Sequence, residues 1–257
     1  MHNVILEIAN LSKRYYTGLW ERQAVDAVCD ISFTVQKGDI FGLIGGSGCG
    51  KTSVIKMALG LSRPSGGTVL YKGKDLVTAT RKEWYFLRKE IQAVFQHPQM
   101  TFNPRRNIYF ACAEPVRLYG LAHGKRDEER FVFNMIEKVG ISRDQLKKFP
   151  HELSGGQAQR LSIIRAVSLN PELLVCDEPT SMLDVSVQAQ ILQLLWNIHK
   201  ERRMTMLFIS HDLDVVQAFC THVAVMRQGK IVESGPVHKV FETPQHEYTR
   251  YLISSRL

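Results

Sequence analysis

Residues 45–52 have the types and spacing needed to bind a polyphosphate. They are Gly-Gly-Ser-Gly-Cys-Gly-Lys-Thr and match the pattern GxxxxGK[ST]. Glycines let consecutive backbone N–H groups turn toward one point, and the start of a following helix adds the positive end of its dipole. Lys51 could reach the β and γ oxygens, and the Thr52 hydroxyl could bind Mg²⁺. A glycine-rich turn that binds nothing is the alternative, but it explains neither the apolar run before the pattern nor the helix-like stretch after it.

The loop and the helix start supply most of the candidate ligands of the phosphates. These residues are Gly45, Gly46, Ser47, Gly48, Cys49, Gly50, Lys51, Thr52 and Ser53. Cys49 is interpreted as a small loop residue, and a redox role is the alternative.

Two acids follow a second apolar run, at residues 173–176. Asp177 stands where the predicted strand ends, a position that suits a ligand of Mg²⁺ or of its waters. Glu178 comes next and could accept a proton from an attacking water, a role that typically contributes about 10²- to 10⁴-fold in rate. The alternative is a solvated turn that happens to hold two acids. The phosphate loop in the same chain favours the catalytic interpretation.

A second helix start also favours an anion. Residues 153–160 are Leu-Ser-Gly-Gly-Gln-Ala-Gln-Arg, in which Ser154 suits a helix N-cap and two glycines leave the helix end open. Only the first helix start carries a lysine. One nucleotide cannot easily serve both within one chain, so we expect a second copy to supply the other half.

Short apolar segments that alternate with helices must position these residues. A buried strand is predicted at residues 40–44, an edge strand at 4–8, and further strands at 31–35, 68–71, 91–95, 173–176 and 206–209. A turn is predicted at Gly66-Gly67, a hairpin around residues 228–229, and helices at 50–61, 187–199 and 247–255. Such alternation predicts a largely parallel sheet that is covered on both faces, with ligands beyond the carboxyl ends of its strands.

Strand signals vanish between about residues 97 and 168, where prolines and a glycine break several helix-like stretches. The predicted fold is therefore α/β: a phosphate-loop NTPase core with a mainly parallel sheet, an antiparallel β subdomain and an inserted α-helical subdomain. We predict one domain over residues 1–257, with the core at about 1–96 and 169–257 and the helical subdomain at about 97–168.

Composition supports a single globular domain. The chain has 257 residues, of which 44% are hydrophobic and 23% charged. No apolar run approaches the roughly 18–20 residues needed to span a bilayer, and the start does not resemble a secretory signal. The five cysteines form no CxxC pair, which argues against zinc and favours a reduced, cytosolic setting. Cys176 is expected in the core.

The net charge of +8 leaves two interpretations open. A basic surplus can indicate nucleic acid, anionic lipid or phosphorylated ligands. It can also be an ordinary solvated surface, which we favour because no run of five basic residues occurs.

Residues 153–160 resemble the signature sequence of the ATP-binding cassette (ABC) ATPases. In that family two cassettes face each other head to tail, and the signature of one caps the γ-phosphate bound to the other. The resemblance implies that four residues contact the nucleotide of a partner cassette: Ser154, Gly155, Gly156 and Gln157.

Other segments match the family one by one. Gln96 matches its glutamine loop, which touches Mg²⁺ or the attacking water and links the site to the permease. Asp184 ends a segment, Ser-Met-Leu-Asp, that resembles the D-loop at the dimer interface. His211 resembles the switch histidine, which holds the γ-phosphate. Tyr15 resembles the aromatic residue that stacks on adenine, although the adjacent Tyr16 is an alternative.

Residues 95–98, 102–105 and 246–252 are similar to the peptide and nickel importer branch. The chain stops at Leu257 without the cysteine-bearing segment of many peptide members, which weakens the oligopeptide interpretation and leaves nickel, metallophores and other small solutes open. The resemblance implies ATP and Mg²⁺ as cofactors. It also implies a second cassette (identical or homologous), transmembrane permease subunits, an extracytoplasmic solute-binding protein, and a location on the cytoplasmic face of the membrane.

Two rival functions were weighed. ABC-type ATPases that act on nucleic acid in repair, chromosome organisation or translation would fit the basic charge, but they usually carry a long coiled coil, zinc cysteines or two tandem cassettes. A phosphate-loop kinase would have no use for the signature and the D-loop. No nucleic-acid partner is expected.

Overall fold

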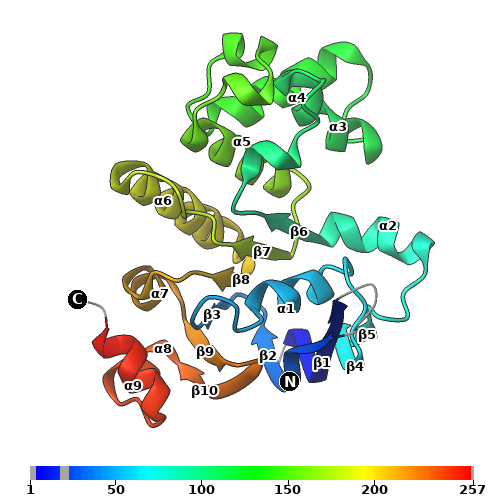
Figure 1. The fold of residues 1–257 in the computed structure, drawn as a ribbon. Helices are drawn as coiled ribbons and strands as arrows, with labels where there is room; N and C mark the ends of the chain where they lie inside the picture. The colour runs from blue at the N-terminus through cyan, green and yellow to red at the C-terminus, as the bar shows by residue number, and fades with distance from the viewer. Residues whose placement is uncertain (1–3, 18–22, 256–257) are drawn as a thin grey trace. The chain divides into compact units, whose positions relative to one another are not determined.

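The computed structural model describes residues 4–17 and 23–255, so the predicted domain of residues 1–257 extends past the described part at both ends (Figure 1). The chain forms two compact units. The first comprises Met1–Trp84 with Arg203–Leu257, and the second comprises Tyr85–Arg202. Within the described part, no helix is both long enough and apolar enough to cross a membrane.

The first unit contains an antiparallel sheet with the strand order β2-β1-β4-β5. Its strands are β1 (Val4–Thr17), β2 (Gln23–Gln36), β4 (Gly66–Tyr71) and β5 (Lys74–Asp75). The predicted antiparallel β subdomain is confirmed. The predicted edge strand at residues 4–8 is wrong, because β1 pairs with β2 on one side and with β4 on the other. The predicted turn at Gly66-Gly67 is also wrong, since both glycines belong to β4.

The remaining strands of the first unit lie in the order β10-β9-β3-β8. They are β3 (Ile40–Ile44), β8 (Thr205–Ile209), β9 (His222–Arg227) and β10 (Lys230–Pro236). Strand β3 runs parallel to β8 and β9, while β9 and β10 form the predicted antiparallel hairpin. All residues of β3 and β8 are buried, as expected of parallel strands covered on both faces. The helices are α1 (Lys51–Ala58), α7 (Leu213–Phe219), α8 (Val237–Glu242) and α9 (Glu247–Ser254).

The second unit contains the parallel pair β6 (Ile91–Val94) and β7 (Leu173–Asp177). Its helices are α3 (Ile108–Leu118), α4 (Lys125–Glu137), α5 (Gly155–Val167) and α6 (Val185–Arg202), with 3₁₀ turns at η1 (Pro98–Thr101), η2 (Arg143–Lys147) and η3 (Pro150–Glu152). Helix α2 (Arg81–Glu90) crosses the division between the units. The segment between β6 and β7 is helical, as expected, and the boundary at 97–168 stays a prediction.

Helix α5 forms the centre of the second unit. Nine of its thirteen residues are buried, because apolar and small side chains occur all around it rather than along one stripe. Cys176 in β7 is fully buried, which raises the pKa of its thiol and confirms that it is a core residue.

Candidate functional site

The predicted phosphate loop joins β3 to α1. Gly50 is the N-cap of α1, and the helix start has neither a side-chain cap nor an acidic residue in its first turn. The first-turn amides and the helix dipole are therefore available to an anion. The Nζ of Lys51 donates to the carbonyl oxygens of Gly45 (2.8 Å) and Gly46 (3.0 Å), so the side chain lies folded against its own loop. These features fit a polyphosphate ligand.

Close packing explains two of the loop glycines. A Cβ on Gly45 would lie 2.1 Å from the carbonyl oxygen of Met226, and one on Gly50 would lie 2.2 Å from that of Ala27. The φ of Gly50 is 111°, which side chains disfavour. Neighbouring backbone therefore presses on the loop at both ends, and only glycine fits.

His211 lies at the same edge of the sheet as the phosphate loop. In the parallel pair β3–β8, Leu43 is opposite Ile209. Gly45 follows Leu43 by two residues and His211 follows Ile209 by two, so both come just after the same end of the pair. The backbone N–H of Asp212 donates to the Ser210 hydroxyl (3.0 Å), which holds the turn that carries His211. The predicted histidine and the loop thus share the carboxyl ends of adjacent strands.

Tyr15 lies against the start of α1. Its hydroxyl donates to the hydroxyl of Ser53 at 3.3 Å, and the Nζ of Lys13 is 5.0 Å from its ring. The hydrogen bond with Ser53 lowers the pKa of Tyr15, although burial acts against it. The alternative, Tyr16, is 65% exposed, and no bond of it to the loop or to α1 is seen among the described residues. The contact with Ser53 favours Tyr15 as the residue at the nucleotide.

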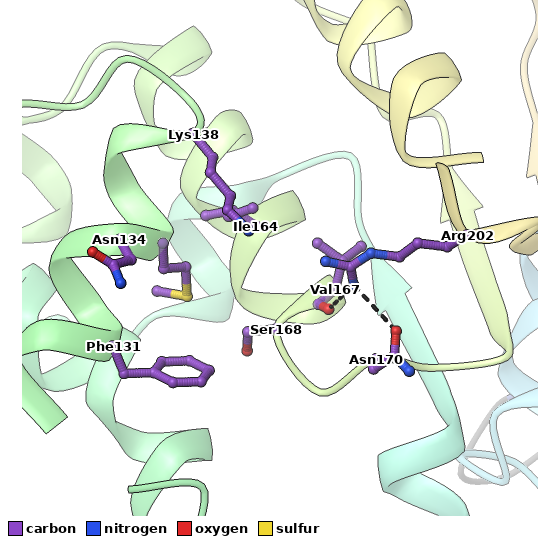
Figure 2. Close-up of a pocket in the computed structure, with 9 residues that line it drawn as sticks. Phe131, Asn134, Lys138, Ile164, Val167, Ser168, Asn170 and Arg202 are labelled. Carbon is purple, nitrogen blue, oxygen red and sulfur yellow. Dashed lines mark hydrogen bonds between the residues drawn. The ribbon is translucent and has the colours of Figure 1, made fainter. Parts of the chain in front are cut away.

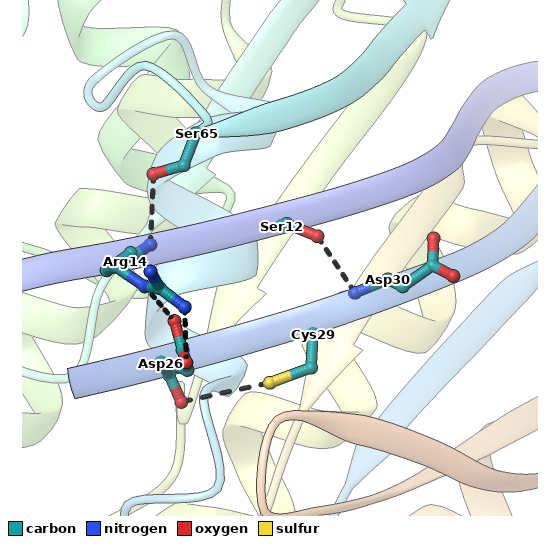
Figure 3. Close-up of polar contacts among 6 residues, drawn as sticks. All are labelled: Ser12, Arg14, Asp26, Cys29, Asp30 and Ser65. Atoms are coloured by element: carbon teal, nitrogen blue, oxygen red, sulfur yellow. Dashed lines mark hydrogen bonds and ion pairs between the residues drawn. The ribbon is translucent and has the colours of Figure 1, made fainter. Parts of the chain in front are cut away.

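The segment that presents Tyr15 is fixed by polar contacts between β1 and its neighbours (Figure 3). The guanidinium of Arg14 donates twice to Asp26, at 2.5 and 2.9 Å, and this hydrogen bonding lowers the pKa of that carboxyl. The backbone N–H of Arg14 donates to the Ser65 hydroxyl (3.0 Å), and that of Asp30 donates to the Ser12 hydroxyl (3.0 Å).

The second unit carries the predicted glutamine and acids. In the parallel pair β6–β7, Val94 is opposite Cys176. Gln96 follows Val94 by two residues and Glu178 follows Cys176 by two. Asp177 is the last residue of β7. Gln96, Asp177 and Glu178 therefore meet at one edge of the pair, as predicted for strand-end residues.

Glu178 has an unusual backbone. Its φ is 48°, in the left-handed region that costs most residues about 1–3 kcal/mol. The Ser181 N–H and hydroxyl both donate to the carbonyl oxygen of Glu178, at 3.2 and 2.9 Å. This turn redirects the chain immediately after the strand and fixes the base of the Glu178 side chain.

One hollow of about 360 Å³ in the second unit gathers three of the predicted segments. Gln96 of the glutamine loop, Gly155 of the signature and Ser181 to Leu183 of the D-loop line it. Asp184 follows Leu183 directly and is exposed.

The signature begins α5 in the predicted manner. Ser154 is the N-cap: its hydroxyl accepts from the Gln157 N–H (3.3 Å), while the Gln157 side chain accepts from the Ser154 N–H (3.1 Å). Ser154 and Gly155 are exposed. Gly156 is buried, and a Cβ there would lie 2.5 Å from Cγ1 of Val187. Gly156 therefore allows α5 to approach α6, a packing role that the sequence did not indicate.

The predicted ligands of Mg²⁺ are Thr52 in the first unit and Gln96 and Asp177 in the second. Their hydroxyl, amide and carboxylate oxygens are of the kind that Mg²⁺ prefers, usually together with phosphate oxygens. Among the described residues, no three His, Cys, Asp or Glu side chains gather as a ready-made metal centre. Donors of these kinds fit a metal that arrives with a nucleotide.

Another hollow, of about 410 Å³, lies between α4 and the end of α5 (Figure 2). Arg202 closes one side by donating to the carbonyl oxygen of Val167 (2.8 Å) and to Asn170 Oδ1 (3.4 Å). None of the predicted site residues lines it.

The sequence missed one residue at the phosphate loop. The backbone N–H of Gly46 donates to the hydroxyl of Tyr248 in α9 at 3.0 Å. The two are 202 positions apart, and the segment around Tyr248 had served only to indicate a branch of the family. Only the sheet order brings them together, so no local signal could have found the pair.

Comparison with known proteins decides the family. A family model described as ABC transporter matches residues 28–181, which is more than half of the chain. This chain belongs to the ABC transporter family. It is an ATPase of the cassette type, as the sequence resemblance implied.

Relatives of this ABC protein cover nearly its whole length. The oligopeptide transport ATP-binding protein OppF of Bacillus subtilis (strain 168) is 38% identical over 99% of this chain and 83% of its own. The glutathione import ATP-binding protein GsiA of Salmonella typhimurium is 39% identical over 98% of this chain but only 41% of its own.

Solved structures confirm the fold. The ATP-binding cassette MJ0796, a dimer bound to ADP and Pi after hydrolysis, superposes with a TM-score of 0.81 at 23% identity, covering 91% of this chain and 99% of its own. The protein cbiO1 from Clostridium perfringens, part of the ABC transporter complex cbiONQ, superposes with a TM-score of 0.77 at 26% identity, and the match covers 99% of this chain and 96% of cbiO1.

Proposed function

We propose that this ABC ATPase powers a peptide importer by binding and hydrolysing ATP between two cassettes. The observation that carries the proposal is the helix start at Gly50 and Lys51. Its first-turn amides have no side-chain cap, its first turn holds no acidic residue, and the Lys51 ammonium lies against the loop. This is the arrangement that a triphosphate needs.

Each half of the proposed site has a defined task. Lys51 and the amides of the loop bind the phosphates, and Tyr15 stacks on adenine at the start of α1. From the opposite cassette, Ser154 to Gln157 present a capped helix start to the γ-phosphate, with Ser154 and Gly155 exposed, and Asp184 lies at the interface.

Glu178 is the proposed general base. It takes a proton from the attacking water, and His211 and Gln96 orient the groups around it. Thr52, Asp177 and Gln96 would hold Mg²⁺, which supplies positive charge to the phosphate oxygens when bound. The strand registers support this division of roles, because they place the glutamine beside the acid and the histidine beside the loop.

Cargo and partners follow from the relatives. OppF is named for oligopeptide transport and GsiA for glutathione import, which favours peptides over nickel as the cargo. The proposed partners are a second cassette, transmembrane permease subunits and an extracytoplasmic solute-binding protein. The chain itself is proposed to lie on the cytoplasmic face of the membrane. The expected weakness of the oligopeptide interpretation, which rested on the end of the chain, is outweighed by these likenesses.

Uptake of labelled peptides tests the proposal. We expect cells lacking this chain to lose uptake of a di- or oligopeptide, and the parent chain to restore it. The Lys51→Ala variant should not restore it, whereas the control Lys230→Ala, at an exposed lysine outside the loop, should. Unchanged peptide uptake, together with salt-sensitive binding of nucleic acid by the purified chain, would support the nucleic-acid alternative instead.

A further inference from the structure

The peptide group between Gly45 and Gly46 is held at both of its ends. Its carbonyl oxygen, on Gly45, accepts from the Nζ of Lys51 at 2.8 Å. Its N–H, on Gly46, donates to the hydroxyl of Tyr248 at 3.0 Å. A peptide group is planar, so a bond that fixes the direction of the N–H also fixes that of the carbonyl. Tyr248 thus acts on the group that positions the lysine.

Tyr248 is itself anchored from two sides. Its backbone N–H donates to His246 Nδ1 (3.0 Å), which caps α9. The carboxylate of Glu233 in β10 accepts from the N–H groups of Gln245 (2.8 Å) and His246 (3.0 Å), and thereby ties the start of α9 to the sheet. The guanidinium of Arg227 in β9 lies 4.8 Å from the Tyr248 ring. The hydroxyl is therefore presented to the loop by a braced side chain.

Gly46 leaves the space that this contact needs. A Cβ on Gly46 would lie 3.1 Å from the Tyr248 hydroxyl, which is tighter than ordinary van der Waals contact. Gly46 does not have a positive φ, so its backbone would accept alanine. The tyrosine hydroxyl, rather than backbone strain, is what a larger residue would meet.

We propose that Tyr248 is a positioning residue for the phosphate loop: its hydroxyl holds the Gly45–Gly46 peptide so that the loop is ordered before ATP arrives. Without that bond the peptide can rotate, because glycine on both sides allows it. Binding would then have to order the loop first, so the apparent affinity for ATP would be the intrinsic affinity multiplied by the fraction of time that the loop is ordered. The inference rests on the proposed ATP site at Lys51.

The Tyr248→Phe variant removes only the hydroxyl. We expect the Kd for ATP to rise about three- to tenfold, the range of one neutral hydrogen bond. KM for ATP should rise to the same extent, with kcat unchanged to within about twofold. The Kd for inorganic tripolyphosphate, measured by competition with a fluorescent ATP analogue, should rise by the same factor as that for ATP. The reason is that the effect lies at the phosphates rather than at adenine. Tyr251→Phe, at a 66% exposed tyrosine of the same helix, is the matched control and should leave all these values unchanged.

A double-mutant cycle tests the contact itself. Gly46→Ala should weaken ATP binding in the parent chain. The same substitution should weaken ATP binding much less in the Tyr248→Phe background, where the hydroxyl is absent. The inference would be overturned if Gly46→Ala reduced ATP affinity equally in both backgrounds. It would also be overturned if Tyr248→Phe lost thermal stability while keeping the Kd of the parent.

The proposed ATP site can be checked in the same experiment. If the parent binds ATP, Lys51→Ala does not, and Tyr248→Phe matches Tyr251→Phe, then only the role of Tyr248 fails. If Lys51→Ala binds ATP as tightly as the parent, the proposed ATP site is wrong, and so is the inference about Tyr248.

Discussion

Glu178 is held in a left-handed backbone conformation at the end of a buried strand, with its carbonyl oxygen bound by Ser181. Strain of this kind persists only where the surrounding structure holds it, and it clusters at functional sites. The aligned register of β6 and β7 puts Gln96 beside it. At the scale of single residues, the proposed chemistry therefore depends on one carboxylate whose backbone is held in place.

Glu178→Gln tests that role. We expect ATP hydrolysis to fall about 10²- to 10⁴-fold, because the amide cannot take a proton from water, while ATP binding is retained. Phosphate release at saturating Mg-ATP measures the first effect, and calorimetry measures the second. Glu201→Gln, at an exposed acid in α6, is the control and should keep the parent rate. A parent rate in Glu178→Gln would remove Glu178 from the mechanism.

At the scale of elements, the start of α5 serves both stability and the proposed contact with a partner. Ser154→Ala should lower the free energy of unfolding by about 1 kcal/mol, because the capping bond is lost. Ser154→Asp keeps a good cap but places a negative charge where the γ-phosphate of the partner is proposed to lie. We expect Ser154→Asp to match the parent in urea denaturation and yet lose most ATP hydrolysis. Hydrolysis by Ser154→Asp at the parent rate would contradict the partner contact.

The start of α2 predicts a pH dependence. Glu83 accepts from Lys74 Nζ (2.7 Å) and from the N–H and hydroxyl of Thr80 (2.7 and 2.8 Å), which lowers its pKa from 4.5 to about 2. A lowered folded pKa means that the stabilisation is fully present above pH 4.5 and is lost as the pH falls toward 2. We expect the Tm advantage of the parent over Glu83→Gln to shrink across this interval. An advantage that stays constant with pH would show that the charge of Glu83 is not involved.

The sequence predicted those elements best whose signal is local. Strand β3 and the Ser154 cap were predicted because an apolar run or a capping residue can be recognised from a few neighbouring positions. Helix α2 was missed because only Leu87 among its residues is buried, so it has no apolar stripe. The interior place of β1 was missed because its pairing with β4 joins segments about sixty residues apart, a distance over which residue patterns carry no signal.

At the scale of the whole molecule, the predicted site residues divide between two units. Tyr15, the phosphate loop and His211 belong to the first unit, while Gln96, the acids, the signature and the D-loop belong to the second. The motifs along the chain predicted the chemistry of the site residues in each unit. The contact between Gly46 and Tyr248 could not be predicted, because it depends on how β9, β10 and α9 pack in three dimensions.

Particle mass in the presence of nucleotide tests the central claim most directly. The proposed account places each ATP between the Lys51 loop of one cassette and the Ser154 helix start of another, so blocking hydrolysis should trap a pair. Light scattering of the Glu178→Gln chain, which has a mass of 29.3 kDa, should show two cassettes per particle with Mg-ATP and one without it. The pair is either two copies or this chain with a copurifying cassette, and Ser154→Asp should prevent it. A single-chain mass with ATP bound, and with any copurifying cassette present, would contradict the account.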